Sequence, residues 1–361
     1  MNFNPLRLSL ARKRRQLNQK RLAEEIDGAP LTISRWEKGT HVPTRENVQA
    51  LAAALEFPAE FFYGSDSTEP EKRDVSFRSQ KGMTAKVRDA ALAAGSIGFL
   101  LNEWVEARFS LPVVNVPDLG GVEPEQAARH LREIWGLGEV PITNMVELLE
   151  SKGVRVFSLV QNTKTVNAYS LWQCGKPFVF LNTFKSAESS RFDAAHELAH
   201  LVLHQDGAIT GREAEDQADQ FSSAFLMPRA DVIACCANEV FSVHSILMHK
   251  KRWKVSAMAL NYTLHKIGIL SDWRYRDFSI ALARMGYRRG EPKGMPRERS
   301  MVWGKVLTML WGEGVTTADI AKQLSLPVSE VEDLVFDAAY QGNGASLDRK
   351  KRSEAPKLEC L

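Results

Sequence analysis

The chain has 361 residues, of which 44% are hydrophobic and 25% are charged. These ordinary values exclude disorder as the main state, and the length predicts two or three globular domains. No apolar run reaches the roughly 18 residues of a membrane span, and the first residues lack the apolar stretch of a secretory signal. The four cysteines have neither zinc-knuckle nor disulfide-framework spacing. We therefore expect a reduced, cytoplasmic protein that does not contact a membrane.

The net charge of +3 is distributed unevenly. The first fifty residues contain ten Lys or Arg and five Asp or Glu, whereas the remainder of the chain is slightly acidic. A basic segment on a nearly neutral body points weakly towards nucleic acid. The same charge also fits a surface that is merely solvated, so the choice between these two interpretations depends on the spacing of residues.

Short helices with sharp turns are predicted over residues 5–65. Asn18 is expected to cap a helix over Gln19–Ile26. A third helix should run from about Pro30 to Lys38 and close at Gly39, and Thr44 is expected to cap a fourth. The residues expected to face inward are Leu22, Ala23, Ile26, Ile33, Trp36, Val48, Leu51, Ala52 and Leu55; those expected to face outward are Thr32, Ser34, Arg35 and Lys38.

The polar stretch Ser65–Lys81 is predicted to be a linker. A long helix follows over Ala85–Arg108, and its apolar stripe fits either a dimer interface or core packing. Prolines and a glycine pair up to Gly121 mark a boundary. Beyond it, helices are expected over Glu123–Trp135, Asn144–Lys152 and Glu213–Met227, and strands over Val154–Val160, Val166–Trp172 and Phe178–Leu181.

The fold predicted from this pattern is α+β and mostly helical. Further helices are expected over 240–285 and 300–340, with a flexible break at Gly290–Pro296. The predicted domains are a helical bundle at 1–65, a linker and long helix at 66–112, a central domain with a small mixed sheet at 113–236, a helical region at 237–343 and a disordered basic tail at 344–361.

The strongest signal is His-Glu-Leu-Ala-His at residues 196–200. Side chains four apart on a helix share one face, so His196 and His200 can hold one metal ion, with Glu197 placed to take a proton from water. A catalytic zinc needs a third protein ligand, for which Glu215 on the next predicted helix is the best candidate. Asp219, one turn further, can orient a ligand histidine.

Other interpretations of this motif remain open. The segment can be a surface helix with solvated histidines, or the metal site can be structural or inactive. His204 either supports the ligands or is a partly buried surface histidine. Mixed His and carboxylate ligands favour zinc and also admit manganese or iron.

The histidine motif precedes Glu-Asp-Gln-Ala-Asp-Gln-Phe at 215–221 and Leu-Met-Pro at 226–228, and together they resemble the ImmA/IrrE family of zinc metallopeptidases. The resemblance spans about residues 115–235, although serines at 222 and 223 replace a small apolar pair. It implies a zincin-like domain in which His196, His200 and Glu215 bind zinc and Glu197 is the general base. Asp219 occupies an Asn/Asp position of the family pattern.

The resemblance extends to the predicted strands at 167–170 and 178–182. In zinc peptidases of this general build, the strand before the metal helix commonly runs beside the substrate backbone, and here Phe178–Leu181 is the candidate. The implied mechanism combines a zinc-polarised carbonyl, water activated by Glu197 and proton return to the leaving amine.

Residues 18–23 and 32–39, followed by Pro43, resemble the Cro/CI (XRE) helix-turn-helix. In that fold the third helix enters the major groove. Gln19 and Lys38 would then contact phosphates, and Arg35 would read base edges because its fork suits guanine. Thr32 and Ser34 are lesser candidates. The third helix begins Ala-Pro-Leu, where base-reading polar residues are often found, so we expect sequence discrimination that either is modest or rests on Arg35 and methyl contacts.

Alternatives also exist for this basic segment. It can be a helical protein-interaction module, although the Trp-Glu-Lys-Gly ending at 36–39 is a narrower pattern. Because one such unit usually reads a half-site, a homodimer is expected. A second similar string lies at 317–331, where Pro327 and the acidic residues Glu330, Glu332 and Asp333 argue against a phosphate surface.

These features predict a bacterial regulator that binds an operator in double-stranded DNA and carries a zinc peptidase domain. The family resemblance implies cleavage of a repressor or other regulatory protein in a stress or mobile-element response. The alternative is a DNA-binding transcription factor or antitoxin-like repressor without proteolysis, whose zinc domain senses a ligand or partner.

Overall fold

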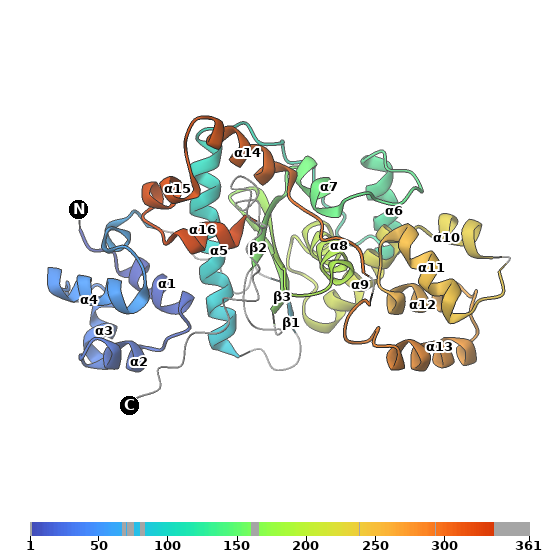
Figure 1. The fold of residues 1–361 in the computed structure, drawn as a ribbon, viewed down its shortest axis with the longest axis horizontal. Helices are drawn as coiled ribbons and strands as arrows, with labels where there is room; N and C mark the ends of the chain where they lie inside the picture. The colour runs from blue at the N-terminus through green and yellow to red at the C-terminus, as the bar shows by residue number, and fades with distance from the viewer. Residues whose placement is uncertain are drawn as a thin grey trace, which may run out of the picture.

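The structure of the protein is a computed structural model that describes residues 2–66, 70, 76–79, 84–159, 166–237, 239–292 and 294–335. The predicted fold class is confirmed, since most of this chain is helical and one small mixed sheet lies near its middle (Figure 1). Within these ranges no helix has both the length and the hydrophobicity to cross a bilayer. The tail expected to be disordered, 344–361, lies outside the described residues.

A helical bundle forms the N-terminal end of the described chain. Its elements are α1 (Pro5–Arg14), α2 (Gln19–Glu25), α3 (Pro30–Glu37), α4 (Arg45–Leu55) and the 3₁₀ helix η1 (Ala59–Tyr63). Asn18 caps α2 by accepting a hydrogen bond from the Arg21 N–H at 2.7 Å, and Thr44 caps α4 in the same way. Both caps were predicted. The predicted inner faces are buried, except that Ile26 and Ala52 are half-buried.

The long helix α5 (Ala85–Glu106) joins the bundle to the sheet, because it packs on α1 and on the strands β2 (Arg155–Leu159) and β3 (Val166–Gln173). Two glycines allow this close approach. A Cβ at Gly95 would lie 2.5 Å from the Tyr169 hydroxyl, and one at Gly98 would lie 2.9 Å from the Phe180 ring. The apolar stripe of α5 is buried within the chain itself, so core packing accounts for it.

The sheet has four strands in the order β1-β3-β4-β2, with β1 at Ser76–Ser79 and β4 at Lys176–Asn182. β3 is antiparallel to β1 and β4, whereas β2 is parallel to β4. The linker prediction for Ser65–Lys81 is therefore wrong at β1. A strand of four residues has too little alternation to be recognised from sequence, and only its partner β3 defines it.

The helices from Pro124 to Cys236 include the one that carries the histidine motif. They are α6 (Pro124–Ile134), α7 (Met145–Ser151), α8 (Ala187–Leu203), α9 (Gly211–Leu226) and α10 (Arg229–Cys236). α8 lies on β3 and β4, and α9 packs between α8 and α6. Each predicted helix in this part exists, with its ends shifted by one or two residues.

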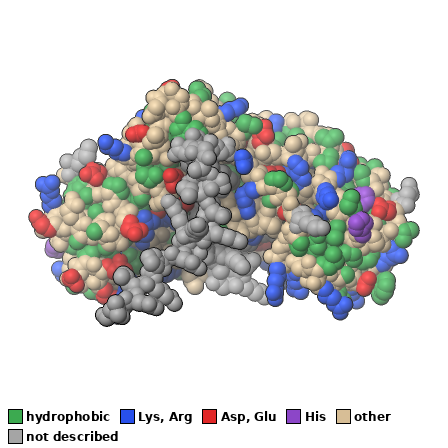
Figure 2. All heavy atoms as spheres, in the orientation of Figure 1, with side chains coloured by type: hydrophobic (Ala, Val, Ile, Leu, Met, Phe, Trp, Pro, Cys, Tyr) green, Lys and Arg blue, Asp and Glu red, His purple; other side chains and the backbone are tan. Residues whose placement is uncertain are grey.

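The C-terminal helices separate into two groups. α11 (Val243–Trp253), α12 (Ala257–Lys266) and α13 (Asp272–Arg284) pack together, whereas α14 (Met301–Gly312), α15 (Thr317–Leu324) and α16 (Val328–Leu334) return towards α5 and the sheet (Figure 1). In the first group α13 leaves Trp273 and Ile280 more than half exposed, and hydrophobic side chains are plain over this part of the face in Figure 2.

The segment Gly290–Pro296 differs from its prediction as a flexible break. Lys250, which is buried on α11, lies 2.9 Å from carboxylate oxygens of both Glu188 and Glu291. The backbone N–H of Met295 also donates to Glu188 at 3.0 Å. A buried charge is costly to leave without its partner, so these contacts hold the described part of the segment against the start of α8.

Candidate metal centre and nucleic-acid interface

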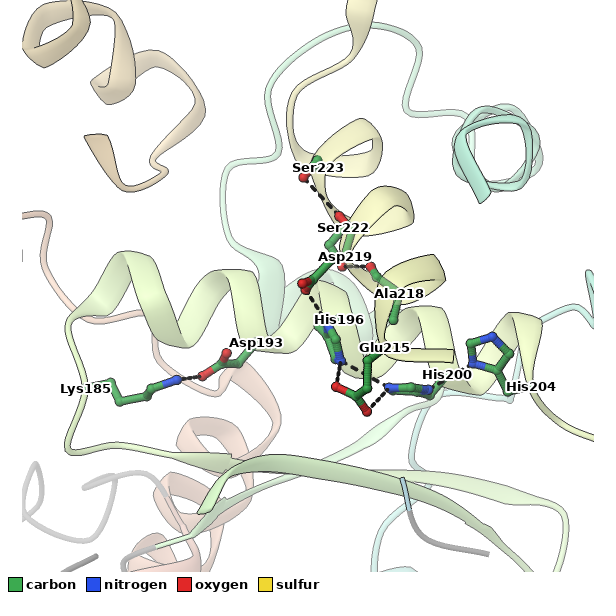
Figure 3. Close-up of polar contacts among 10 residues, drawn as sticks. All are labelled: Lys185, Asp193, His196, His200, His204, Glu215, Ala218, Asp219, Ser222 and Ser223. Carbon is green, nitrogen blue, oxygen red and sulfur yellow. Dashed lines mark hydrogen bonds and ion pairs between the residues drawn. The ribbon is translucent and has the colours of Figure 1, made fainter. Parts of the chain in front are cut away.

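The histidine motif lies in the second half of α8, on the face turned towards α9 and the sheet. His196 and Glu197 are fully buried, and His200 is 5% exposed. One helical turn separates the two histidines, and Glu215 reaches them from the first half of α9. Figure 3 shows the three side chains His196, His200 and Glu215 pointing towards one another.

The three candidate ligands have the spacing of a metal site. One ligand atom from each of His196, His200 and Glu215 lies within 4.8 Å of the others. The two Nε2 atoms are 3.1 Å apart, and the Glu215 oxygens lie 3.3 Å from Nε2 of His196 and 3.6 Å from Nε2 of His200. The sequence prediction named this set, and the fold brings all three together.

The chemistry of these donors suits a cation. An ionised aspartate only accepts hydrogen bonds, so the Nδ1 of His196, 3.0 Å from Asp219 Oδ1, carries the hydrogen. The tautomer of His196 with its hydrogen on Nδ1 presents a lone pair at Nε2, opposite the carboxylate of Glu215. Two acceptors that face each other are stabilised by a positive ion between them. Two histidines and one carboxylate are a common set of zinc ligands.

The protonation states also fit metal ligands. Burial opposes ionisation of Glu215, but its contacts with the rings of His196 and His200 outweigh this effect and lower its pKa to about 2. Burial lowers the pKa of His200 to about 4. Near neutral pH, Glu215 is therefore ionised and His200 is neutral, which are the forms that bind metal.

Glu197 has a partner that the sequence analysis did not assign. The Ser170 hydroxyl on β3 donates to Glu197 Oε2 at 2.6 Å, and both residues are buried. Burial raises the pKa of Glu197 to about 8, against the opposing effect of His196 and this hydrogen bond. A cation nearby favours the ionised form. Ser170 belongs to the predicted strand at 167–170, and the family resemblance of that strand was the sequence feature that could have identified it.

The prediction that Phe178–Leu181 runs beside a substrate is contradicted by the sheet order. This strand, β4, is paired with β2 on one side and with β3 on the other. Its backbone groups have no free edge, since both neighbouring ladders use them. β3 also lies next to α8, and β1 pairs with the side of β3 that does not face β4.

The predicted DNA-contacting residues lie on or next to α3. Arg35 and Lys38 are exposed, whereas Thr32 and Ser34 are half-buried. Gln19, at the start of α2, donates from Nε2 to Glu37 at 2.7 Å. Glu37 also accepts two hydrogen bonds from Arg12, at 2.6 and 3.0 Å. Arg35 and Lys38, the two cations of the predicted set, are thus its exposed members.

Two of the basic residues near the N-terminus have an internal partner. Arg14 lies 2.7 Å and Arg15 lies 2.6 Å from carboxylate oxygens of Glu330, whose side chain is 3% exposed. Glu330 belongs to α16, in the second helix-turn-helix-like string. Glu330 is one of the three acidic residues that argued against a phosphate-binding surface in this string. In the structure it pairs with Arg14 and Arg15 at the end of α1.

A helix-turn-helix bundle joined to a small mixed sheet with an HExxH helix defines a DNA-binding regulator fused to a peptidase-like domain. Two family models agree with this description. Residues 149–265 match the IrrE N-terminal-like domain of the M78 peptidase family, and residues 8–62 match a helix-turn-helix model. The chain therefore fuses an XRE-type helix-turn-helix to an ImmA/IrrE-type domain, as the resemblances implied. No curated protein matches the chain in a sequence search.

The IrrE-type match differs in extent from the sequence prediction. It begins in α7 and continues through α11 to the end of α12, whereas the resemblance was expected over about 115–235. Peptidases of the M78 family typically depend on a metal, and the cluster of His196, His200 and Glu215 is where this chain can hold one.

Proposed function

We propose that the protein is a bacterial transcriptional regulator whose M78 domain is a zinc-dependent endopeptidase, and that its substrate is a repressor or another regulatory protein. The observation that supports the peptidase most directly is the convergence of His196, His200 and Glu215 within 4.8 Å, beside the buried carboxylate of Glu197. The helix-turn-helix domain supports DNA binding, which would bring the peptidase to an operator.

In this proposal His196, His200 and Glu215 hold the metal, and Asp219 fixes the ring of His196. A zinc ion bound there would polarise the peptide carbonyl and lower the pKa of an attacking water. Glu197 removes a proton from that water and returns it to the leaving amine. Its Oε2 is held by Ser170, while Oε1 is buried without a hydrogen-bond partner among the described residues and is free to take the proton.

Loss of the Glu197 carboxylate separates proteolysis from DNA binding. Replacing Glu197 with Gln keeps the shape of the side chain but removes the base, so we expect peptide cleavage to fall by about 10²–10⁴-fold. Zinc content and operator binding should stay at wild-type values. The matched control is Glu213→Gln, at an exposed position in the first turn of α9. A Glu197→Gln protein that regulates its promoter as the wild type does would rule out proteolysis as the source of function.

The second candidate is a transcription factor without proteolysis, in which the metal domain senses a ligand or partner. The ion pairs from Arg14 and Arg15 to Glu330 favour it, because they tie the DNA-binding bundle to the rest of the chain. Metal content of wild type and His196→Ala by mass spectrometry is the first measurement for both candidates. About one zinc per chain, lost in the variant, supports the site; no bound metal in either leaves only the DNA-binding regulator.

The oligomeric state and location belong to the same proposal. One helix-turn-helix unit usually reads a half-site, so a homodimer on a two-fold operator is expected. A regulator that acts on DNA works in the cytoplasm. Sedimentation of the purified protein, alone and with operator DNA, checks the dimer.

A further inference from the structure

The second candidate ligand, His200, has a partner outside the ligand set. Its Nδ1 lies 2.9 Å from Nδ1 of His204, one turn further along α8. The other ring nitrogen of His204, Nε2, lies 3.1 Å from Oε1 of Gln217 on α9. His200, His204 and Gln217 thus form a chain of contacts that begins at the metal centre and ends on the neighbouring helix.

The acceptor at the end of this chain determines where each hydrogen lies. Gln217 Oε1 only accepts, so the Nε2 of His204 carries a hydrogen, and the Nδ1 of neutral His204 has a lone pair. That lone pair accepts the hydrogen on Nδ1 of His200. The Nε2 of His200 is then left with a lone pair, aimed at Glu215 and His196, which is the tautomer that binds a metal.

We propose that His204 is a positioning residue: through Gln217 it fixes the tautomer and ring orientation of His200, as Asp219 does for His196. The two ligand histidines are therefore held by different means, one by a carboxylate and the other by a neutral imidazole. This inference rests on the metal site of the proposed function, but it requires no proteolysis.

Metal affinity of three His204 variants tests this role. In competition with a chelator, His204→Ala should bind Zn²⁺ about 10–100-fold more weakly than wild type, the usual cost of losing a partner of a ligand histidine. His204→Asn should recover most of the affinity, because the Asn carbonyl oxygen lies near the place of Nδ1. His204→Gln, whose amide lies near the place of Nε2, should not. The matched control is His130→Ala, at an exposed position on α6.

A spectroscopic measurement distinguishes orientation from packing. With Co²⁺ in place of zinc, the visible absorption of His204→Ala should differ from that of wild type, and His204→Asn should restore the wild-type spectrum. Equal affinity and equal spectra in wild type and His204→Ala would overturn the proposal, as would equal losses in all three variants. A protein that shows the expected losses but cleaves nothing would retain the positioning role and lose the peptidase.

A separate observation concerns β1, which lies in the chain between the bundle and the peptidase domain. β1 pairs antiparallel with β3, and Ser76 is opposite Ser170, the residue that donates to Glu197. An extended peptide that adds to a sheet does so at such an edge. We infer that β1 acts as an intramolecular competitor, which occupies the edge of β3 that a peptide would use beside the catalytic carboxylate.

Proline substitution tests the inference on the metal-free protein, where cleavage plays no part. Phe77→Pro with Arg78→Pro removes backbone N–H groups of β1, and Phe77→Ala with Arg78→Ala keeps them. A labelled synthetic peptide of residues 70–84 should bind the proline variant at least about tenfold more tightly than wild type or the alanine variant, by fluorescence anisotropy. Equal binding to all three proteins would overturn the inference and leave the metal site untouched.

Discussion

The metal centre and the predicted DNA-contacting surface, formed by Arg35 on α3 and Lys38 at its end, both contain residues that the sequence analysis named as functional. The two regions differ in whether those residues have partners within the chain. At the metal centre, His196 and Glu197 are fully buried, and each has a partner within the chain, in Asp219 and Ser170. On α3, Arg35 and Lys38 are exposed. Buried charges require partners supplied by the fold, whereas exposed cations remain available to a polyanion such as DNA.

The contact between α1 and α16 has features of both regions. Arg14 and Arg15 belong to the basic segment, yet their partner Glu330 is internal and buried. A basic residue near the N-terminus is therefore not automatically a DNA contact. The comparison predicts that changes at buried pairs affect stability and that changes on α3 affect only DNA affinity.

The largest effect on stability is expected at Glu330. Glu330→Ala leaves Arg14 and Arg15 without their buried partner, so the free energy of unfolding should fall by about 3–5 kcal/mol. Urea denaturation measures it, with Glu313→Ala at an exposed position as the control. A double-mutant cycle with Arg14→Met should show strong coupling. A loss below about 1 kcal/mol would place this contact with ordinary surface ion pairs.

The next effect is a pH dependence at Glu150, which is buried and accepts hydrogen bonds from the Ser300 hydroxyl and the N–H groups of Met301 and Val302. Burial raises its pKa from 4.5 to about 7 despite these bonds. The folded state thus holds its proton to higher pH than the unfolded state. The stability from this group is complete below about pH 4.5 and is lost as pH rises to about 7, by about 3 kcal/mol in total.

Glu150→Gln should abolish that dependence, because Gln does not titrate. The measurement is urea denaturation of wild type and variant between pH 4.5 and 8, and the quantity of interest is the difference between their slopes. Parallel curves for the two proteins would show that the pKa of Glu150 is ordinary.

A smaller effect is expected from Arg35, and it should concern DNA alone. Arg35→Ala should weaken specific operator binding by about 1–3 kcal/mol if Arg35 reads a guanine. Its stability should match that of wild type, because the side chain is exposed. Binding to operator and to unrelated DNA is compared at one salt concentration; an unchanged footprint would refute the assignment of Arg35 as base reader.

The smallest effect is expected at Lys38. As a phosphate contact, Lys38→Ala should weaken binding to all DNA sequences alike and reduce the salt slope of binding by about one. Titrations at several salt concentrations measure it. A loss confined to the operator sequence would instead make Lys38 a base contact and remove the distinction drawn between it and Arg35.

The elements of this fold were largely predictable because local rules define them. Helical spacing defined α5 and α8, and the caps at Asn18 and Thr44 defined the starts of α2 and α4. The candidate ligands were predictable for the same reason, since the histidines are one turn apart on a single helix. β1 was missed because its only definition is the edge of β3.

The partners of the site were less predictable. Asp219 was named because it lies one turn from Glu215. Ser170 and Gln217 lie far from their partners in the chain, on β3 and α9, and no local spacing connects them to α8. The expectation that β4 runs beside the substrate failed for a related reason, because strand order in a sheet is a long-range property that strand patterns do not contain.

The sequence by itself determined the types of domain, the identity of the candidate ligands and the helix that presents Arg35, because each depends on residues within one or two turns. The tertiary structure alone decided that β4 lies between β3 and β2, that β1 pairs with the other side of β3, that Glu330 binds Arg14 and Arg15, and that His204 connects His200 to Gln217. Those results come from packing between elements distant in the chain, where burial forces polar groups to find partners.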